Sequence, residues 1–300
     1  MSSPWIEALR SVALIVPDVA SAERFYTEIW NLDVAARSDD SVYLRGTGDA
    51  HHLISLHPGP QPALRDVTLR ARSAQALDEI AHATVAAGGR IISSTGPINE
   101  PGGGVGLTVV DPDGRVFRIV HDDVRHADTH EASDRPVRLA HVVLNAHDVS
   151  ATQAFLEKAF GFSLSDRTRI MAFMNCDRDH HSLALGDTDN DALNHIAFLM
   201  PDVDSVMRGG GRMRDAGYSI DWGPGRHGPG NNAFNYFVGP DGFVIEYTAE
   251  VEQIDSSYRV GGPEDWTWPP GRVDQWGISQ PPSARLKEAQ RVIYFMKENN

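Results

Sequence analysis

Two histidines and a glutamate lie in apolar, strand-like segments of the second half of this 300-residue chain. His141 falls in Leu-Ala-His-Val-Val-Leu, His195 in Leu-Asn-His-Ile-Ala-Phe and Glu246 in Val-Ile-Glu-Tyr. A lone carboxylate is costly to bury in such a segment, but a bound cation stabilises it. Two neutral imidazoles and one carboxylate form the facial triad that suits non-haem Fe(II), with Zn or Mn as other occupants. We therefore expect His141, His195 and Glu246 to bind a divalent metal ion.

The chain contains an internal repeat, which predicts where these residues lie in the fold. Apolar strand-like runs end at Asp18 and at Asp148, an offset of 130 residues. The same offset aligns the segment Ala-His-His-Leu at 50–53 with His-His-Ser-Leu at 180–183, so we expect His51 to be the counterpart of His181. The polar, aperiodic segment near residues 123–136 reads as a linker between two similar halves.

The first half lacks the candidate ligands. The positions that align with His141, His195 and Glu246 hold Ser11, Asp66 and Arg118, at offsets of 130, 129 and 128 residues. A cation in the place of the carboxylate opposes the binding of a second cation. We therefore predict one metal ion per chain.

Each half repeats one plan, in which a strand is followed by an amphipathic helix and then by further strands separated by turn residues. This pattern predicts an α+β protein of four βαβββ modules, paired into two similar domains. We expect helices at Ser21–Trp30, Ser150–Phe160, about Val203–Ala216 and Ser283–Lys297; the third is weakened by Gly209, Gly210 and Gly211. The expected boundaries are an N-terminal domain at 1–122, a linker at 123–136, a C-terminal domain at 137–250 and a tail at 251–300.

Composition excludes several classes of protein. A net charge of −14 disfavours partners with anionic surfaces, so we expect neither nucleic-acid nor membrane binding. No apolar run approaches the ~20 residues of a membrane-spanning helix, and the first residues lack the features of a signal peptide. Cys176 is the one cysteine, so the chain forms no internal disulfide. Together these features predict a cytoplasmic protein.

Several motifs in the second half resemble a known family. They are Asp-His-His-Ser-Leu-Ala-Leu at 179–185, Asn-His-Ile-Ala-Phe at 194–198 and Gly-Arg-His-Gly at 225–228, followed by Tyr236 and Glu246. Residues 7–250 are similar to the vicinal oxygen chelate superfamily, which has the glyoxalase/bleomycin resistance/dihydroxybiphenyl dioxygenase fold. The second half resembles the type I extradiol catechol dioxygenases of that superfamily.

The resemblance implies a reaction and a set of roles. His141, His195 and Glu246 would bind Fe(II), or Mn(II), and the substrates would be a catechol and O2. His181 would transfer protons to and from the substrate, since an imidazole titrates near the working pH. His227 and Tyr236 would donate hydrogen bonds to the reacting oxygens. The product would be a catechol ring opened beside the diol, and relatives of this kind commonly form homo-oligomers.

Other interpretations fit parts of the pattern. One is a glyoxalase-type lyase or isomerase, although such enzymes commonly use a further carboxylate that the aligned positions do not offer. Another is a metal-free protein that binds an aromatic ligand. Among the other histidines, we expect His52, His147 and His180 to be turn or surface residues. Candidates for binding an acidic catechol are Arg178, Arg226 and Arg272, but the aromatic tail and apolar strands favour a neutral, hydrophobic and bicyclic one.

Overall fold

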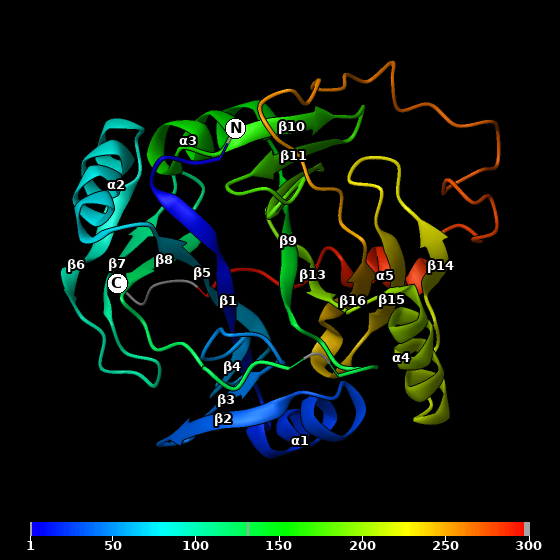
Figure 1. Cartoon of the computed structure of the whole chain (residues 1–300), viewed down its shortest axis with the longest axis horizontal. Helices are drawn as coiled ribbons and strands as arrows, with labels where there is room; N and C mark the ends of the chain where they lie inside the picture. Colours follow the sequence, from blue (N-terminus) through cyan, green and yellow to red (C-terminus); the bar gives the residue numbers. More distant parts are fainter. Residues whose placement is uncertain (1, 131, 297–300) are drawn as a thin grey trace.

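The first half of the chain forms one eight-stranded sheet. In the computed structural model, which describes residues 2–130 and 132–296, its strand order is β2-β3-β4-β1-β5-β8-β7-β6 (Figure 1). Strands β1 and β5 pair antiparallel at the centre, and each pairs in parallel with the last strand of its own module, β4 or β8. The strands are β1 Ile6–Val16, β2 Asp33–Ser38, β3 Ser41–Arg45, β4 Ile54–Pro58, β5 Ala63–Ala71, β6 Arg90–Pro97, β7 Val105–Val110 and β8 Val116–His121.

The second half repeats this sheet strand for strand, in the order β10-β11-β12-β9-β13-β16-β15-β14. Each half thus contains two βαβββ modules, which confirms the α+β fold expected from the repeat. The strands are β9 Arg138–Ala146, β10 Ser163–Arg167, β11 Met171–Asn175, β12 Leu183–Asp187, β13 Leu193–Leu199, β14 Trp222–Arg226, β15 Ala233–Val238 and β16 Val244–Ala249.

One helix follows the first strand of each module, and each begins at a capping side chain. The side chains of Asp18, Ser73, Asp148 and Asp202 accept a hydrogen bond from the backbone N–H three residues later, as N-caps do. The helices are α1 Val19–Arg24, continued by the π-helical η1 Phe25–Ile29, α2 Ala74–Ala86, α3 Val149–Phe160, α4 Val203–Asp215, the 3-10 turn η2 Pro240–Gly242 and α5 Ala284–Ala289.

The three glycines do not interrupt α4, and two of them, Gly209 and Gly210, lie where the helix approaches the sheet closely. A Cβ atom on Gly209 would lie 2.7 Å from the ring of Tyr247, and one on Gly210 would lie 2.9 Å from the side chain of Asn235. The cost of glycine in a helix is therefore offset by packing that a larger residue would prevent.

The helix expected at Ser283–Lys297 is wrong beyond its first turns. It ends at Ala289, and residues after it form backbone hydrogen bonds with β13 and β5. The N–H of Leu193 donates to the carbonyl of Ile293, and the N–H of Leu64 donates to that of Tyr294. These backbone bonds join the segment to both halves; Lys297 lies outside the described residues.

Aromatic residues join the two halves in a shared core. The ring of Trp30, from the first half, stacks on that of Tyr247 with centroids 3.6 Å apart and planes 6° apart. The Tyr247 hydroxyl also donates to the carbonyl of Trp30 at 2.8 Å.

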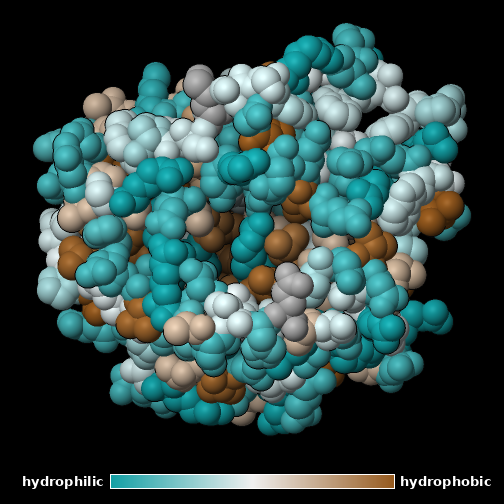
Figure 2. Space-filling model, viewed as in Figure 1, coloured by the Kyte–Doolittle hydropathy of each residue, from teal (hydrophilic) through white to brown (hydrophobic). Residues whose placement is uncertain are grey.

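On the face drawn in Figure 2, by contrast, hydrophilic residues predominate and apolar ones are scattered. Among the described residues, no helix is long and apolar enough to cross a membrane.

Candidate metal centre

The register of three neighbouring strands brings the predicted ligands to one face of the second sheet. Ala197, on β13, lies opposite His141 of β9 on one side and opposite Glu246 of β16 on the other. His195 is two residues from Ala197 and so points to the same face. The predicted triad therefore meets although its members are far apart in the sequence.

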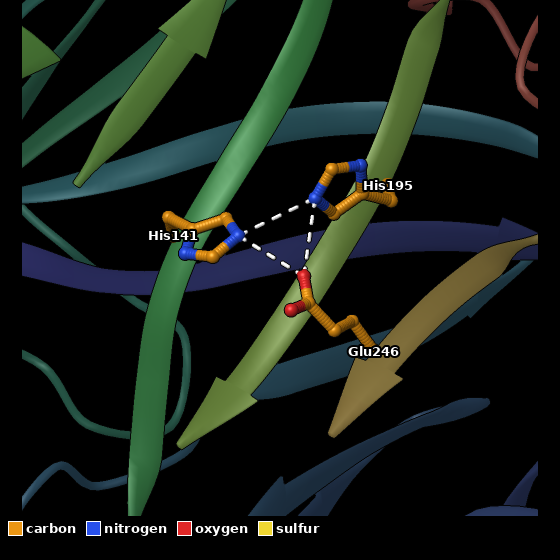
Figure 3. Close-up of side chains that lie close together, drawn as sticks. All are labelled: His141, His195 and Glu246. Atoms are coloured by element: carbon orange, nitrogen blue, oxygen red, sulfur yellow. Dashed lines mark hydrogen bonds and ion pairs between the residues drawn. The ribbon is translucent and has the colours of Figure 1, made fainter. Parts of the chain in front are cut away.

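The three side chains converge on one point (Figure 3). The Oε2 atom of Glu246 lies 3.1 Å from Nε2 of His141 and 3.2 Å from Nε2 of His195, and the two nitrogens are 3.3 Å apart. Ligands bound at right angles, each about 2.1 Å from a metal ion, lie about 3 Å from one another. All three residues are buried, and Oε1 of Glu246 has no hydrogen-bond partner among the described residues. The donor set and its spacing fit a divalent cation.

Protonation of the three groups also suits a metal. Burial alone would raise the pKa of Glu246, but the imidazoles of His141, His195 and His227 hold it well below its ordinary value. Burial lowers the pKa of His195 to about 4. At neutral pH the triad thus presents a carboxylate and an unprotonated His195, the form in which each binds a metal.

Two residues that the sequence reasoning did not single out orient His195. The side-chain oxygen of Asn194 lies 2.8 Å from Nδ1 of His195, so it accepts the Nδ1 proton and leaves Nε2 free to bind a metal. The same oxygen accepts a hydrogen bond from Gln290, which immediately follows α5. No sequence pattern pointed to these partners of His195. Gln290 in particular is 96 residues from Asn194 along the chain.

The structure brings His181, His227 and Tyr236 to the triad. The ring of His181 lies 4.3 Å from that of His141, between centroids. Tyr236 lies opposite Glu246 in the pairing of β15 with β16, and its hydroxyl is 3.0 Å from Nε2 of His227 and 3.4 Å from Nε2 of His195. Burial raises the pKa of Tyr236 well above its ordinary value, so its phenol keeps its proton.

His52 and His180 lie in loops, as the expectation of turn or surface residues allows, but they are not at the surface. His52 is 5% exposed and His180 is fully buried. The ring of Tyr43 lies 4.9 Å from that of His52, and the N–H of His180 donates to the carbonyl of Glu252. His147, by contrast, is exposed as expected and contacts Asp191.

At the paired histidines, the structure aligns the two halves differently from the offset of 130 expected from the sequence. The N–H groups of Leu53 and Ser182 make the same bond, to the carbonyls of Leu44 and Met174. Their offset is 129, since the loop before β4 is one residue longer than the loop before β12. His52, rather than His51, is therefore the counterpart of His181.

In the first half, the equivalent positions form an ion-pair cluster. Arg118 lies 3.5 Å from Asp66 and 2.5 Å from Glu100. Burial opposes the charge of Arg118, but both carboxylates raise its pKa above the ordinary value. A guanidinium thus occupies the space where the second half can hold a cation.

The segment after β16 packs against the loop that carries His227. A Cβ atom on Gly228 would lie 2.7 Å from Trp268 and 3.1 Å from Trp266, and the side chain of Gln275 donates to the carbonyl of His227 at 2.5 Å. Arg226, a candidate for binding an acidic substrate, already pairs with Glu250. The tail therefore helps to hold one wall of the centre.

Comparisons with known proteins agree with this architecture. A model of the Glyoxalase/Bleomycin resistance protein/Dioxygenase superfamily matches residues 8–119 and 138–247. The crystal structure of an Mn(II)-bound glyoxalase from Novosphingobium aromaticivorans is 31% identical and has a TM-score of 0.86, covering 100% of this chain and 96% of that one.

Two curated relatives are also similar in sequence. Metapyrocatechase 2 of Cupriavidus necator is 36% identical over 155 residues, and the match spans 49% of this chain but only 46% of the relative. The manganese-dependent 2,3-dihydroxybiphenyl 1,2-dioxygenase of Geobacillus genomosp. 3 is 24% identical over 279 residues, or 85% of this chain and 86% of the relative. The family expected from the sequence is confirmed: the chain belongs to the Glyoxalase/Bleomycin resistance protein/Dioxygenase superfamily.

Proposed function

We propose that the protein is an extradiol dioxygenase, which opens a catechol ring beside its two hydroxyls and inserts both atoms of O2. The observation that carries this proposal is the position of three proton-bearing side chains, His181, His227 and Tyr236, around a buried triad of only two histidines and one glutamate. Three protein ligands leave coordination positions for substrates. The names of the two dioxygenase relatives support the same reaction.

His141, His195 and Glu246 would hold Fe(II), with Mn(II) as the alternative. The ion would supply a Lewis acid that binds both catechol oxygens and a site for O2 beside them. The set of ligand types accepts either metal. The names of two relatives mention manganese, which supports testing both ions.

His181 would take a proton from a catechol hydroxyl and return it later in the reaction. Burial is the main reason why its pKa is held well below the ordinary value, so the resting imidazole is neutral and can act as a base. His227 and Tyr236 would donate hydrogen bonds to the reacting oxygens, since the phenol keeps its proton and lies 3.0 Å from His227.

The second candidate is a glyoxalase-type lyase or isomerase, which the 31% identical Mn(II)-bound glyoxalase favours. In that reaction a proton moves between carbon atoms and no O2 is consumed. Such enzymes commonly use a further carboxylate. Among the described residues, Glu246 is the one carboxylate of the three side chains that could hold a metal ion at this centre, which favours the dioxygenase. A metal-free protein that binds an aromatic ligand is the third candidate, and the metal content of the gently purified protein tests it.

The deciding experiment compares O2 uptake with substrate loss. Protein loaded anaerobically with Fe(II), or with Mn(II), is mixed with O2 and a panel of catechols that begins with neutral bicyclic ones. We expect one O2 consumed per catechol and a yellow ring-opened product. The His181→Ala variant, loaded equally with metal, is the control and should lose activity by about 10²- to 10⁴-fold. No turnover of any catechol, together with conversion of a 2-oxoaldehyde–thiol hemithioacetal, would support the glyoxalase instead.

A further inference from the structure

His181 is the inner end of a chain of hydrogen-bonding groups that leads away from the metal centre. Its Nδ1 atom lies 3.1 Å from Nδ1 of His180, and Nε2 of His180 lies 2.8 Å from Oδ2 of Asp166. Asp166 is fully buried in β10, the edge strand of the second sheet. The nitrogen of His181 that is not bonded to His180 is Nε2, which leaves this atom for the substrate.

The tail holds Asp166 as a hydrogen-bond acceptor. The backbone N–H of Gly261 donates to Oδ1 at 2.6 Å, and the hydroxyl of Tyr258 donates to Oδ2 at 3.0 Å. A backbone N–H can only donate, and a carboxylate can only accept. The proton between Asp166 and His180 therefore sits on Nε2 of His180.

The position of this proton fixes the direction of the next hydrogen bond, between His180 and His181. A neutral His180 with its proton on Nε2 has a lone pair on Nδ1. That lone pair must accept the proton of His181, which then sits on Nδ1 of His181. Nε2 of His181 is left unprotonated, as a base requires.

The first half contains the same histidine pair with the same direction, since His52 is the counterpart of His181 and His51 that of His180. Nδ1 of His51 lies 2.9 Å from Nδ1 of His52, with ring centroids 5.2 Å and planes 86° apart, against 5.3 Å and 85° for His180 and His181. In this half, NH1 of Arg10 lies 2.7 Å from Nε2 of His52. A guanidinium can only donate, so the proton of His52 sits on Nδ1 and points toward His51.

The two pairs thus share one geometry and one direction, but the charged group that fixes the direction lies at opposite ends, Arg10 beside His52 and Asp166 beside His180. Ala36 occupies the position of Asp166 in the first half, at the same bulge of the edge strand. The carboxylate is present only in the half that carries the metal triad.

We propose that Asp166 is a positioning residue, which acts through His180 to keep the proton of His181 on Nδ1 and the base at Nε2. Tyr258 and Gly261 support it from the tail. The proposal rests on the proposed function only where it says that Nε2 of His181 accepts a proton from the catechol.

The test is a measurement of tautomers by NMR. Full-length protein labelled with ¹⁵N-histidine and loaded with diamagnetic Zn(II) gives long-range ¹H–¹⁵N correlations, which distinguish Nδ1–H from Nε2–H. His181→Gln identifies the signals of His181. We expect His181 of the wild type to carry its proton on Nδ1.

Asp166→Asn should reverse the direction of the hydrogen bonds from residue 166 to His181. Asn has nearly the same size as Asp. The N–H of Gly261 selects the amide oxygen at the Oδ1 position, so the amide NH2 faces Nε2 of His180 and donates to it. We expect His181 to become the Nε2–H form, with kcat of the Fe(II) or Mn(II) enzyme lowered by about 10²- to 10⁴-fold and KM changed less than about twofold. Tyr258→Phe, which keeps the carboxylate, is the matched control and should retain the wild-type tautomer.

Three results would overturn the proposal. They are an Nε2–H form of His181 in the wild type, an unchanged tautomer in Asp166→Asn, and a reversed tautomer with unchanged kcat. The wild-type measurement decides the first even if Asp166→Asn does not fold. A wild type with the expected tautomer that cleaves no catechol would defeat the proposed function and leave the chain of hydrogen bonds in place.

Discussion

Arg118 and Glu246 occupy the same position in the two sheets. Arg118 lies opposite Thr68 where β8 pairs in parallel with β5, and Glu246 lies opposite Ala197 where β16 pairs in parallel with β13. One position therefore carries a cation in the first half and a carboxylate in the second. This exchange separates a half held by ion pairs from a half that fits a metal.

The first prediction concerns metal stoichiometry. Arg118 already compensates Asp66 and Glu100, so a divalent ion in the first half would meet a buried positive charge. We expect one Fe(II) or Mn(II) per chain by elemental analysis after dialysis. A second tightly held equivalent that survives Glu246→Gln would contradict this.

Glu246→Gln should abolish stabilisation by metal. An ion bound only by the folded protein stabilises it by about 2.7 kcal/mol at a concentration of 100 times its Kd. Because Gln lacks the charge that holds the ion, we expect Mn(II) to raise the Tm of the wild type and leave that of the variant unchanged. Glu250→Gln is the matched control, since Glu250 lies four residues away but is exposed. It should respond to Mn(II) like the wild type.

Tyr236→Phe should separate metal binding from turnover. The hydroxyl contacts His227 and His195 but is not part of the triad, so we expect full metal occupancy. Loss of a hydrogen bond to the reacting oxygens should lower kcat by about 10²- to 10³-fold. Steady-state O2 uptake and metal analysis on the same sample check both points. Loss of metal in this variant would mean that the hydroxyl supports the ligands instead.

The free energy of unfolding should fall with acid because of buried histidines such as His57. Burial, aided by the charge of Arg65, lowers the pKa of His57 from 6.5 to about 4. Between these values the unfolded chain binds more protons, so stability is present above pH 6.5 and is lost as the pH falls toward 4. By pH 4.5 the loss from this one group is at most about 2.5 kcal/mol.

Urea unfolding of metal-free protein at pH 7 and pH 4.5 measures this loss. We expect it to be smaller in His57→Gln than in the wild type. In His147→Gln it should not be reduced, because Asp191 raises the pKa of the exposed His147 and that shift has the opposite sign. Equal losses in the wild type and His57→Gln would disprove the assignment.

Arg115 should be important for stability because it is fully buried between carboxylates. It lies 2.8 Å from both Asp111 and Asp113 and 2.5 Å from Asp191, which belongs to the second half. Arg115→Met would leave the buried carboxylate of Asp111 without its charged partner, at a cost of about 3–5 kcal/mol in the free energy of unfolding. Chemical denaturation measures it.

The control for Arg115 is an exposed ion pair. Arg208 and Asp204 form such a pair on α4, and Arg208→Met should change stability by less than about 0.5 kcal/mol. Similar effects of the two substitutions would show that burial of Arg115 contributes little.

Much of the fold could be predicted because the sequence states its plan twice in each half. Alternating apolar residues marked the strands, and amphipathic stretches after Asp18 and Asp148 marked two of the helices, although these begin at Val19 and Val149 rather than at Ser21 and Ser150. Three short strand segments sufficed to single out His141, His195 and Glu246 as candidate metal ligands, since a polar residue inside an apolar strand is conspicuous.

Other features depended on contacts that sequence spacing does not reveal. The one-residue difference between two loops shifted the alignment from His51 to His52, and only the backbone bonds of Leu53 and Ser182 make this visible. The close approach of α4 to Tyr247 explains Gly209, which by propensity argues against a helix.

The sequence by itself determined the repeat, the βαβββ modules and the types of residue that can bind a metal, because these follow from local periodicity. Only the tertiary structure decided that Asp166, His180 and Tyr258 form a chain behind His181, and that Gln290 supports Asn194. The direction of a hydrogen bond depends on which donor and which acceptor meet. Here the partners are up to 96 residues apart in the chain, so folding alone brings them together.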